Sequence, residues 1–175
     1  MAARVRLEPP GLADQGEFLD LVKVSRAFHR PWSDPPADAT AFRALLERNR
    51  GAEFDFNLVR RSEDDAIVGV FELSQIFRGG FQNAYLGYWA GAPYAGQGYM
   101  SEGMNLLLRR AFDEMRLHRI EANIQPGNKP SKALAERSGF RLEGFSPRYL
   151  KVGGRWRDHE RWAILAEESR KRRKR

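Results

Sequence analysis

Residues 84–100 read AYLGYWAGAPYAGQGYM, and this stretch decides how the rest of the chain is interpreted. Residues 84–90 are apolar and aromatic, which is typical of a buried strand. A glycine-rich loop follows over residues 91–98, and we expect a helix from about residue 99 to residue 115. Apolar side chains recur along that helix at helical spacing, namely Met100, Met104, Leu107, Leu108, Ala111 and Met115. Proteins use this order of strand, glycine loop and helix to bind anions.

The loop sequence Gly96-Gln97-Gly98 lets backbone N–H groups approach an anion, and the positive end of the following helix adds to the attraction. A pyrophosphate fits such a site, although some loops of this kind only turn the chain. A dinucleotide-binding Rossmann fold would need a third glycine, where this chain has Ser101, and an acidic end to the next strand, which ends at Gln125. A phosphate-binding P-loop is excluded because the chain lacks Gly-Lys-Ser/Thr.

Outward from this stretch, strands and helices are expected along the whole chain. Strands are predicted at residues 5–7, 54–58, 66–77, 84–90, 118–125, 140–152 and 155–165, and helices at residues 12–29, 38–48, 99–115 and 131–137. The loop at residues 31–36 contains Trp32, and Gly153-Gly154 joins the last two strands. The fold class is therefore α/β, with a mixed sheet that carries helices on its faces.

Composition narrows the function. The 175 residues include no Cys, which excludes a disulfide scaffold, a thiol nucleophile and a Cys-ligated zinc site. The three His residues are too scattered to suggest a metal cluster, so no metal is expected. The N-terminal residues lack the apolar core of a signal peptide, and the uncharged run over residues 79–101 is too polar for a transmembrane helix. A cytoplasmic protein without a membrane segment is expected.

The net charge of +7 lies mainly at the C-terminus, where residues 170–175 read RKRRKR. Six of the 30 Lys and Arg residues are in this run, which leaves 24 against 23 Asp and Glu elsewhere. We expect one domain over residues 1–169 and a basic, disordered tail over residues 170–175. If the tail acts, electrostatic steering to ribosomal RNA or another polyanion is its functional interpretation. Deleting it should then leave turnover of a short peptide unchanged.

Five motifs in register resemble the GNAT acetyltransferases: the strand at 84–90, GQGYM at 96–100, NKPS at 128–131, SGF at 138–140 and GRWRDH at 154–159. Within that superfamily the chain most resembles the RimJ/RimL branch, whose members acetylate the N-termini of ribosomal proteins. Within the branch it is most similar to RimJ. The resemblance covers residues 30–165. It implies a GNAT fold over residues 1–169, with six to seven strands, a splay between the fourth and fifth, and about four helices.

The resemblance implies acetyl-CoA as the donor. Its pyrophosphate would lie on the loop amides of Ala95, Gly96, Gln97, Gly98, Tyr99 and Met100. The pantetheine arm would pair like an extra strand with Tyr88, Trp89 and Ala90, and Asn128 resembles the family's Asn that contacts this arm. The chain has Pro93 where the family usually has Gln or Arg, a departure that costs little because these contacts are mainly to backbone.

Direct transfer to a neutral amine is the mechanism that the resemblance implies. The Tyr that serves as proton donor in related enzymes is replaced by Ala135, while Ser131 matches the Ser thought to take this role in the RimJ/RimL branch. The candidates for the base are Glu121, which is favoured, and Glu72. A carboxylate in an apolar strand can have a raised pKa.

Each of these residues also has a purely structural interpretation. Ser131 could cap the helix that follows it, Asn128 could be a turn residue, and Glu121 could pair with Arg119 or Arg141. Glu72 could face solvent. Tyr88 and Trp89 could be core residues, although alternation sends them to opposite faces.

The acceptor is the least readable part. A protein N-terminus is the leading hypothesis; a small amine such as a polyamine, an amino-acid analogue or an aminoglycoside is the second, and a non-catalytic CoA- or RNA-binding module is the third. An acidic pocket would favour a polycation, and an open groove a peptide. Trp32 is expected at the mouth of the acceptor pocket, and residues 157–159 form either a structural ion pair or a substrate contact. The protein is expected to be a monomer or a homodimer.

Overall fold

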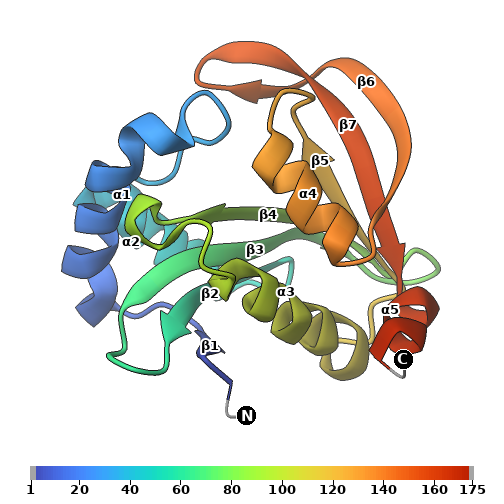
Figure 1. The fold of residues 1–175 in the computed structure, drawn as a ribbon, viewed down its shortest axis with the longest axis horizontal. Helices are drawn as coiled ribbons and strands as arrows, with labels where there is room; N and C mark the ends of the chain where they lie inside the picture. Colours follow the sequence, from blue (N-terminus) through green and yellow to red (C-terminus); the bar gives the residue numbers. More distant parts are fainter. Residues whose placement is uncertain (1–2, 174–175) are drawn as a thin grey trace.

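The computed structural model describes residues 3–173, which form a seven-stranded mixed sheet with helices on both faces (Figure 1). The strands are β1 (Val5–Glu8), β2 (Phe54–Arg61), β3 (Ile67–Phe77), β4 (Asn83–Ala90), β5 (Arg119–Ile124), β6 (Arg141–Val152) and β7 (Arg155–Leu165). Their order across the sheet is β1-β2-β3-β4-β5-β7-β6. Among the described strands, only β4 and β5 pair in parallel. The predicted α/β class and the positions of all seven predicted strands are confirmed.

The helices are α1 (Gln15–His29), α2 (Ala39–Arg48), α3 (Tyr99–Arg109), α4 (Lys129–Arg137) and α5 (Ala166–Arg173). Short turns η1 (Leu12–Asp14) and η2 (Ala92–Tyr94) precede α1 and α3, and a π-helical segment, η3 (Arg110–Glu114), extends α3. Five helices replace the four expected, because the chain after β7 is helical. Within residues 3–173, no helix is long and apolar enough to cross a membrane.

Two apolar cores flank the sheet because successive strand residues point to opposite faces. On one face, Phe71 and Leu86 pack with Met104 and Leu107 of α3 and with Leu134 of α4. On the other face, Val70 and Phe56 pack with Phe18 of α1 and Phe42 of α2. The phenyl rings of Phe18 and Phe42 lie 4.8 Å apart. The sheet therefore separates an α3/α4 side from an α1/α2 side.

Strands β4 and β5 pair only at their beginnings. The paired residues are Asn83, Ala84 and Tyr85 on β4 with Arg119, Ile120 and Glu121 on β5. Beyond these pairs β4 continues to Ala90 and stays paired with β3, while β5 continues to Ile124 and pairs with β7. The two strands therefore diverge, and the predicted splay between the fourth and fifth strands is confirmed.

The C-terminal basic run is a correction to the sequence-based expectation. Residues 170–173 are not disordered: they form the end of α5, and residues 174–175 lie outside the described part of the chain. Arg170 and Arg173 both bind the carboxylate of Asp113 in η3, and Arg172 donates to the carbonyl oxygen of Arg137 at the end of α4. Composition suggested disorder because it cannot show that the folded body supplies partners for these cations.

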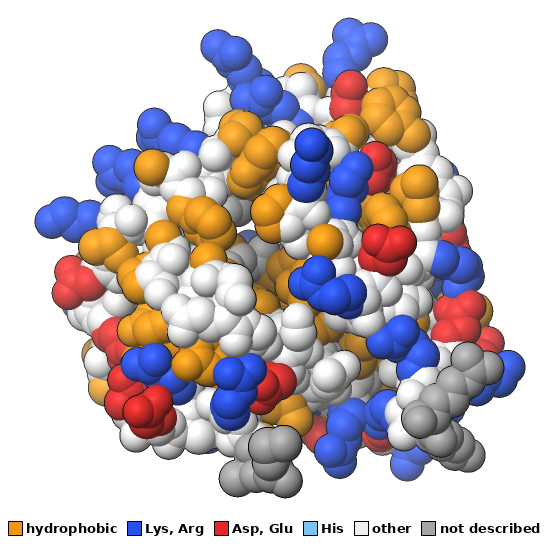
Figure 2. Space-filling model, in the orientation of Figure 1, with side chains coloured by type: hydrophobic (Ala, Val, Ile, Leu, Met, Phe, Trp, Pro, Cys, Tyr) orange, Lys and Arg blue, Asp and Glu red, His pale blue; other side chains and the backbone are white. Residues whose placement is uncertain are grey.

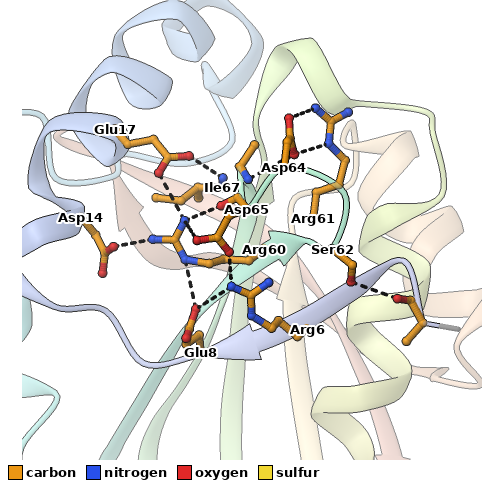
Figure 3. Close-up of polar contacts among 12 residues, drawn as sticks. Arg6, Glu8, Asp14, Glu17, Arg60, Arg61, Ser62, Asp64, Asp65 and Ile67 are labelled. Atoms are coloured by element: carbon orange, nitrogen blue, oxygen red, sulfur yellow. Dashed lines mark hydrogen bonds and ion pairs between the residues drawn. The ribbon is translucent and has the colours of Figure 1, made fainter.

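A buried arginine fastens α1 to the sheet (Figure 3). The side chain of Arg60 on β2 is only 8% exposed and meets four carboxylates, those of Glu8, Asp14, Glu17 and Asp65. Glu17 also accepts a hydrogen bond from the backbone N–H of Ile67, at 2.6 Å. These contacts join β1, η1, the start of α1 and the turn between β2 and β3. They fix the helix whose other end reaches the candidate site.

Candidate active site

A cavity of about 760 Å³ opens where β4 and β5 diverge. The loop before α3 forms one wall and the start of α4 another, while the end of α1 and the end of β5 line the far side. Figure 2 shows a hollow near the middle of this face, edged by hydrophobic side chains. This cavity passes between the diverging strands and is therefore continuous from one side of the sheet to the other.

The glycine loop supplies an anion-binding wall. Gly96 has φ 76°, and Gly98, the N-cap of α3, has φ 85°; glycine adopts these left-handed angles readily. Among residues 3–173 no side chain caps the N-terminus of α3, which leaves its first N–H groups and the positive end of its dipole available to an anion. Five of the six predicted loop residues line the cavity, namely Ala95, Gly96, Gly98, Tyr99 and Met100. Gln97 does not, and its side-chain amide donates to the carbonyl of Pro93 at 2.9 Å.

The end of β4 offers a free edge to an extended ligand. Tyr88, Trp89 and Ala90, which were predicted to pair with the pantetheine arm, line the cavity, and beyond Tyr85 they have no β5 partner. An unpaired strand edge binds extended chains through its backbone N–H and C=O groups. The Trp89 ring packs against Phe18 and His29, so it belongs partly to the α1/α2 core.

Ser131 and Tyr88 form a hydroxyl pair. Ser131 Oγ donates to Tyr88 Oη at 2.9 Å, and Tyr88 Oη donates to the carbonyl oxygen of Ser131 at 2.9 Å. Asn128 is the N-cap of α4 and accepts from the backbone N–H of Ser131 at 3.3 Å. The structural role considered for Ser131 therefore falls to Asn128. Burial raises the pKa of Tyr88 to about 12, so its phenol stays protonated at neutral pH.

Neither predicted carboxylate lines the cavity. Glu121 is buried near the start of β5 and pairs with Arg119 at 2.9 Å, as its structural interpretation expected. Glu72 is opposite Gly87, which does line the cavity, and its carboxylate is 3.7 Å from Arg48. Burial raises the pKa of Glu72, and Arg48 partly opposes this.

The far wall comes from three elements. Phe28 and His29 of α1, with Trp32 and Ser33 after it, line the cavity together with Asn123 of β5, Gln125 directly after β5, and His159 of β7. The side-chain amide of Gln125 donates to the carbonyl of Pro31 at 3.1 Å, which ties this loop to the end of β5. Trp32 therefore lines the cavity, and its contact with the acceptor stays a prediction.

The sequence interpretation missed several of these residues. His29, Phe28, Asn123 and Gln125 were not singled out, because single residues in predicted helices and strands carry no functional signal. The meeting of Tyr88 with Ser131 joins residues 43 positions apart. Alternation along residues 84–90 could have indicated which side of the sheet Tyr88 faces, but not what it meets there. In residues 3–173, no group of three or more His, Asp or Glu side chains could hold a metal ion.

Comparisons with known proteins identify the family. The family model of the acetyltransferase (GNAT) domain matches residues 4–141. The chain is 35% identical over 165 residues to the [ribosomal protein uS5]-alanine N-acetyltransferase of Escherichia coli (strain K12), covering 89% of this chain and 84% of that protein. It is 34% identical over 172 residues to the Probable N-acetyltransferase YjcK of Bacillus subtilis (strain 168), covering 92% and 93%.

A similar solved structure supports the same family assignment. Mycobacterium smegmatis RimJ in complex with CoA-disulfide superposes with a TM-score of 0.86 at 29% identity, over 94% of this chain and 83% of that one. GNAT enzymes take their acetyl group from acetyl-CoA, which supplies a thioester carbonyl for an amine to attack. The residues present fit this donor, since the α3 N-terminus can hold a pyrophosphate and the β4 edge can hold an amide-containing arm. The chain belongs to the GNAT acetyltransferase family and is an acetyl-CoA-dependent N-acetyltransferase.

Proposed function

We propose that this enzyme transfers the acetyl group of acetyl-CoA directly to the N-terminal α-amine of a protein. One continuous cavity reaches from the anion-binding loop to the far wall, so donor and acceptor can meet without a covalent enzyme intermediate. The chain also has no Cys to carry an acetyl group.

The charge of the cavity lining carries the choice of acceptor. Among the described residues no Asp or Glu lines the cavity, and Arg137 is the lining residue that keeps a full charge at neutral pH. A polyamine brings several positive charges, each of which needs a carboxylate partner when it leaves water. A peptide N-terminus brings one reacting amine followed by neutral amide groups. The lining therefore favours a peptide over a polycation.

Each group of cavity-lining residues has its own role in the proposed reaction. The backbone of residues 95–100 would hold the pyrophosphate, the edge of β4 would hold the pantetheine arm, and Asn128 orients Ser131 through its backbone. Ser131 and Tyr88 place a hydroxyl pair in the cavity wall, and the Ser131 hydroxyl can turn from Tyr88 Oη to donate its proton to a developing thiolate. On the far wall, Trp32 and Phe28 offer apolar surface to the first side chain of the acceptor.

The curated relative supports this choice. The E. coli protein at 35% identity is named as an alanine N-acetyltransferase of ribosomal protein uS5, and the match covers most of both chains. A ribosomal protein is therefore the substrate class we propose. The basic C-terminal run contributes less to this proposal than its charge suggested, because Arg170, Arg172 and Arg173 contact the body of the enzyme.

Initial rates of CoA thiol release test the proposal. The acceptors are a peptide with the N-terminal sequence of uS5, the same peptide with a blocked N-terminus, spermidine and an aminoglycoside. We expect release only with the free peptide. Release with spermidine or the aminoglycoside alone would support the small-amine alternative, and no release with any acceptor would support a non-catalytic CoA-binding module.

A further inference from the structure

The cavity contains few groups that could take a proton from an amine. Its titratable lining residues are His29, Tyr88, Tyr94, Tyr99, Arg137 and His159. Phenols and a guanidinium keep their protons at neutral pH, so only the two imidazoles can serve as acceptors. The geometry of their ring nitrogens separates them.

His29 has a structural role, because its ring joins α1 to β4. Its Nε2 lies 2.9 Å from the carbonyl oxygen of Ala90, which can only accept a hydrogen bond, so Nε2 carries the proton. The other nitrogen, Nδ1, is enclosed and without a partner in the described part of the chain. A substrate amine cannot reach either nitrogen without displacing the contact between α1 and β4.

His159 has the opposite arrangement. Its Nδ1 lies 2.9 Å from the carbonyl oxygen of Arg157, which fixes the proton on Nδ1 and leaves a lone pair on Nε2. No hydrogen bond from a described residue reaches Nε2, and Nε2 is not among the enclosed polar atoms. The residue as a whole is only 3% exposed, so the ring is held firmly while it lines the cavity.

The sheet register aims His159 at the acceptor side. Asn123 pairs with Arg161, and His159 is two residues before Arg161, so both side chains point to the face that carries Asn123. The pairing of Ile124 with Glu160 places His159 just beyond the last pair of β5, at the open end of the splay. Asn123, Gln125 and His159 all line the cavity there.

Arg157 and Arg161, two residues before and two residues after His159 on β7, point to the same face of the sheet as His159. Asp158 precedes His159 on β7 and accepts from the backbone N–H of Arg148, while the Tyr149 ring of β6 lies 6.3 Å away. Arg137 of α4, Tyr88 of β4 and His29 of α1 are the titratable residues that the neighbouring elements bring to the same cavity. Burial lowers the pKa of His159, and the hydrogen bond to the Arg157 carbonyl and the charge of Asp158 oppose this only in part. The ring is therefore neutral, and able to accept a proton, at neutral pH.

We propose that Nε2 of His159 accepts the proton of the acceptor amine. The amine nitrogen forms a bond to the acetyl carbon, the bond between that carbon and sulfur breaks, and the amine proton moves to Nε2. The leaving thiolate takes a proton from the Ser131–Tyr88 hydroxyl pair, which regains it from solvent, while His159 returns its proton to solvent. The inference rests on the proposed amine acetylation but on no particular acceptor sequence.

The substitution His159→Asn tests this with little structural change, because the Asn amide can still donate to Arg157 from near the position of Nδ1. We expect kcat at saturating acceptor to fall by about 10²- to 10⁴-fold, the usual contribution of a general base. The KM for acetyl-CoA should stay within twofold. His118→Asn is the matched control, because His118 is exposed, outside the cavity lining, and should keep the wild-type rate.

The pH profile of kcat distinguishes proton transfer from a structural role. The wild type should lose rate in acid as His159 becomes protonated, at a pH below the usual imidazole value of about 6.5 because burial lowers the pKa of His159. The variant should instead rise steadily with pH without a plateau. His159→Gln, measured in the same way, replaces the first variant if that one fails to fold. A folded variant with a wild-type profile and more than a tenth of the rate would overturn the proposal, as would a wild type whose kcat is constant down to pH 5.

The experiment uses whichever amine the wild type acetylates. A wild type that acetylates only a small amine would contradict the proposed acceptor and leave the test of His159 intact.

Discussion

Replacing Arg60 with methionine should destabilise the enzyme far more than a comparable substitution at the surface. Methionine keeps an unbranched apolar side chain along the path of the arginine but removes every charged contact that Arg60 makes in Figure 3. Arg60 is 8% exposed, whereas the side chains of Glu8, Glu17 and Asp65 are 45–62% exposed. Those three carboxylates regain water when Arg60 is lost, so each contributes at most a few tenths of a kcal/mol.

The contact with Asp14 contributes more, because the Asp14 side chain is only 18% exposed. A hydrogen bond between charged groups contributes about 1.5–3 kcal/mol when its partner is left poorly solvated. Together with the three weaker ion pairs, this contact leads us to expect a loss of about 3 kcal/mol in the free energy of unfolding. For a chain of this length, about 3 kcal/mol corresponds to a fall in Tm of roughly 6–12 °C.

The assay is thermal unfolding followed by circular dichroism, with urea unfolding as a second measure. Arg50→Met is the matched control, because Arg50 is 77% exposed and pairs with Glu47 three residues earlier, so its Tm should change by less than about 2 °C. Activity of Arg60→Met at 25 °C should stay near wild type, since the cluster lies at the opposite end of α1 from His29. Equal Tm values for the two variants would refute the argument that burial makes the Arg60 cluster important.

Three further predictions concern the site and its surroundings. Tyr88→Phe and Ser131→Ala should each lower kcat by about 10²-fold, and the double variant should be little worse than either, because the hydroxyls act as a pair; additive losses would contradict the pairing. Burial raises the pKa of Glu72, so the folded state resists its ionisation and Glu72 lowers stability at pH values above its usual 4.5. Glu72→Gln should therefore raise the urea midpoint at pH 7.5 and leave it unchanged near pH 4; a lower midpoint at pH 7.5 would show that the pairing with Arg48 dominates. Removing residues 170–175 should lower Tm by roughly 2–8 °C, because Asp113 and the carbonyl of Arg137 lose their arginine partners; an unchanged Tm would restore the interpretation as a free tail.

The fold was largely predictable because its signals are local. The structure confirms three local predictions of backbone geometry. They came from the alternation in residues 84–90, from the glycines at 96 and 98, and from the spacing of Met100, Met104 and Leu107. The two consecutive glycines, Gly153 and Gly154, likewise mark the turn between β6 and β7. In each case the residues that determine the element lie within the element.

The remaining features depend on contacts between distant residues. Nothing near Tyr88 in the sequence shows that its hydroxyl meets Ser131, and nothing near residue 170 shows that Asp113 supplies a partner for Arg170 and Arg173. The charge of Glu121 suggested a base, yet its role depends on Arg119, which occupies its carboxylate. Functional pairs of this kind follow from the fold and not from local pattern.

The most direct test of the proposed acceptor is to locate the acetyl group on a product. A peptide with the uS5 N-terminal sequence and an internal lysine offers one α-amine and one ε-amine to the same enzyme, and fragmentation mass spectrometry distinguishes the two positions. We predict that the acetyl group is on the N-terminal nitrogen and that blocking this nitrogen abolishes product formation. Acetylation of the lysine at a comparable rate, or transfer to spermidine in preference to the peptide, would contradict the proposed acceptor.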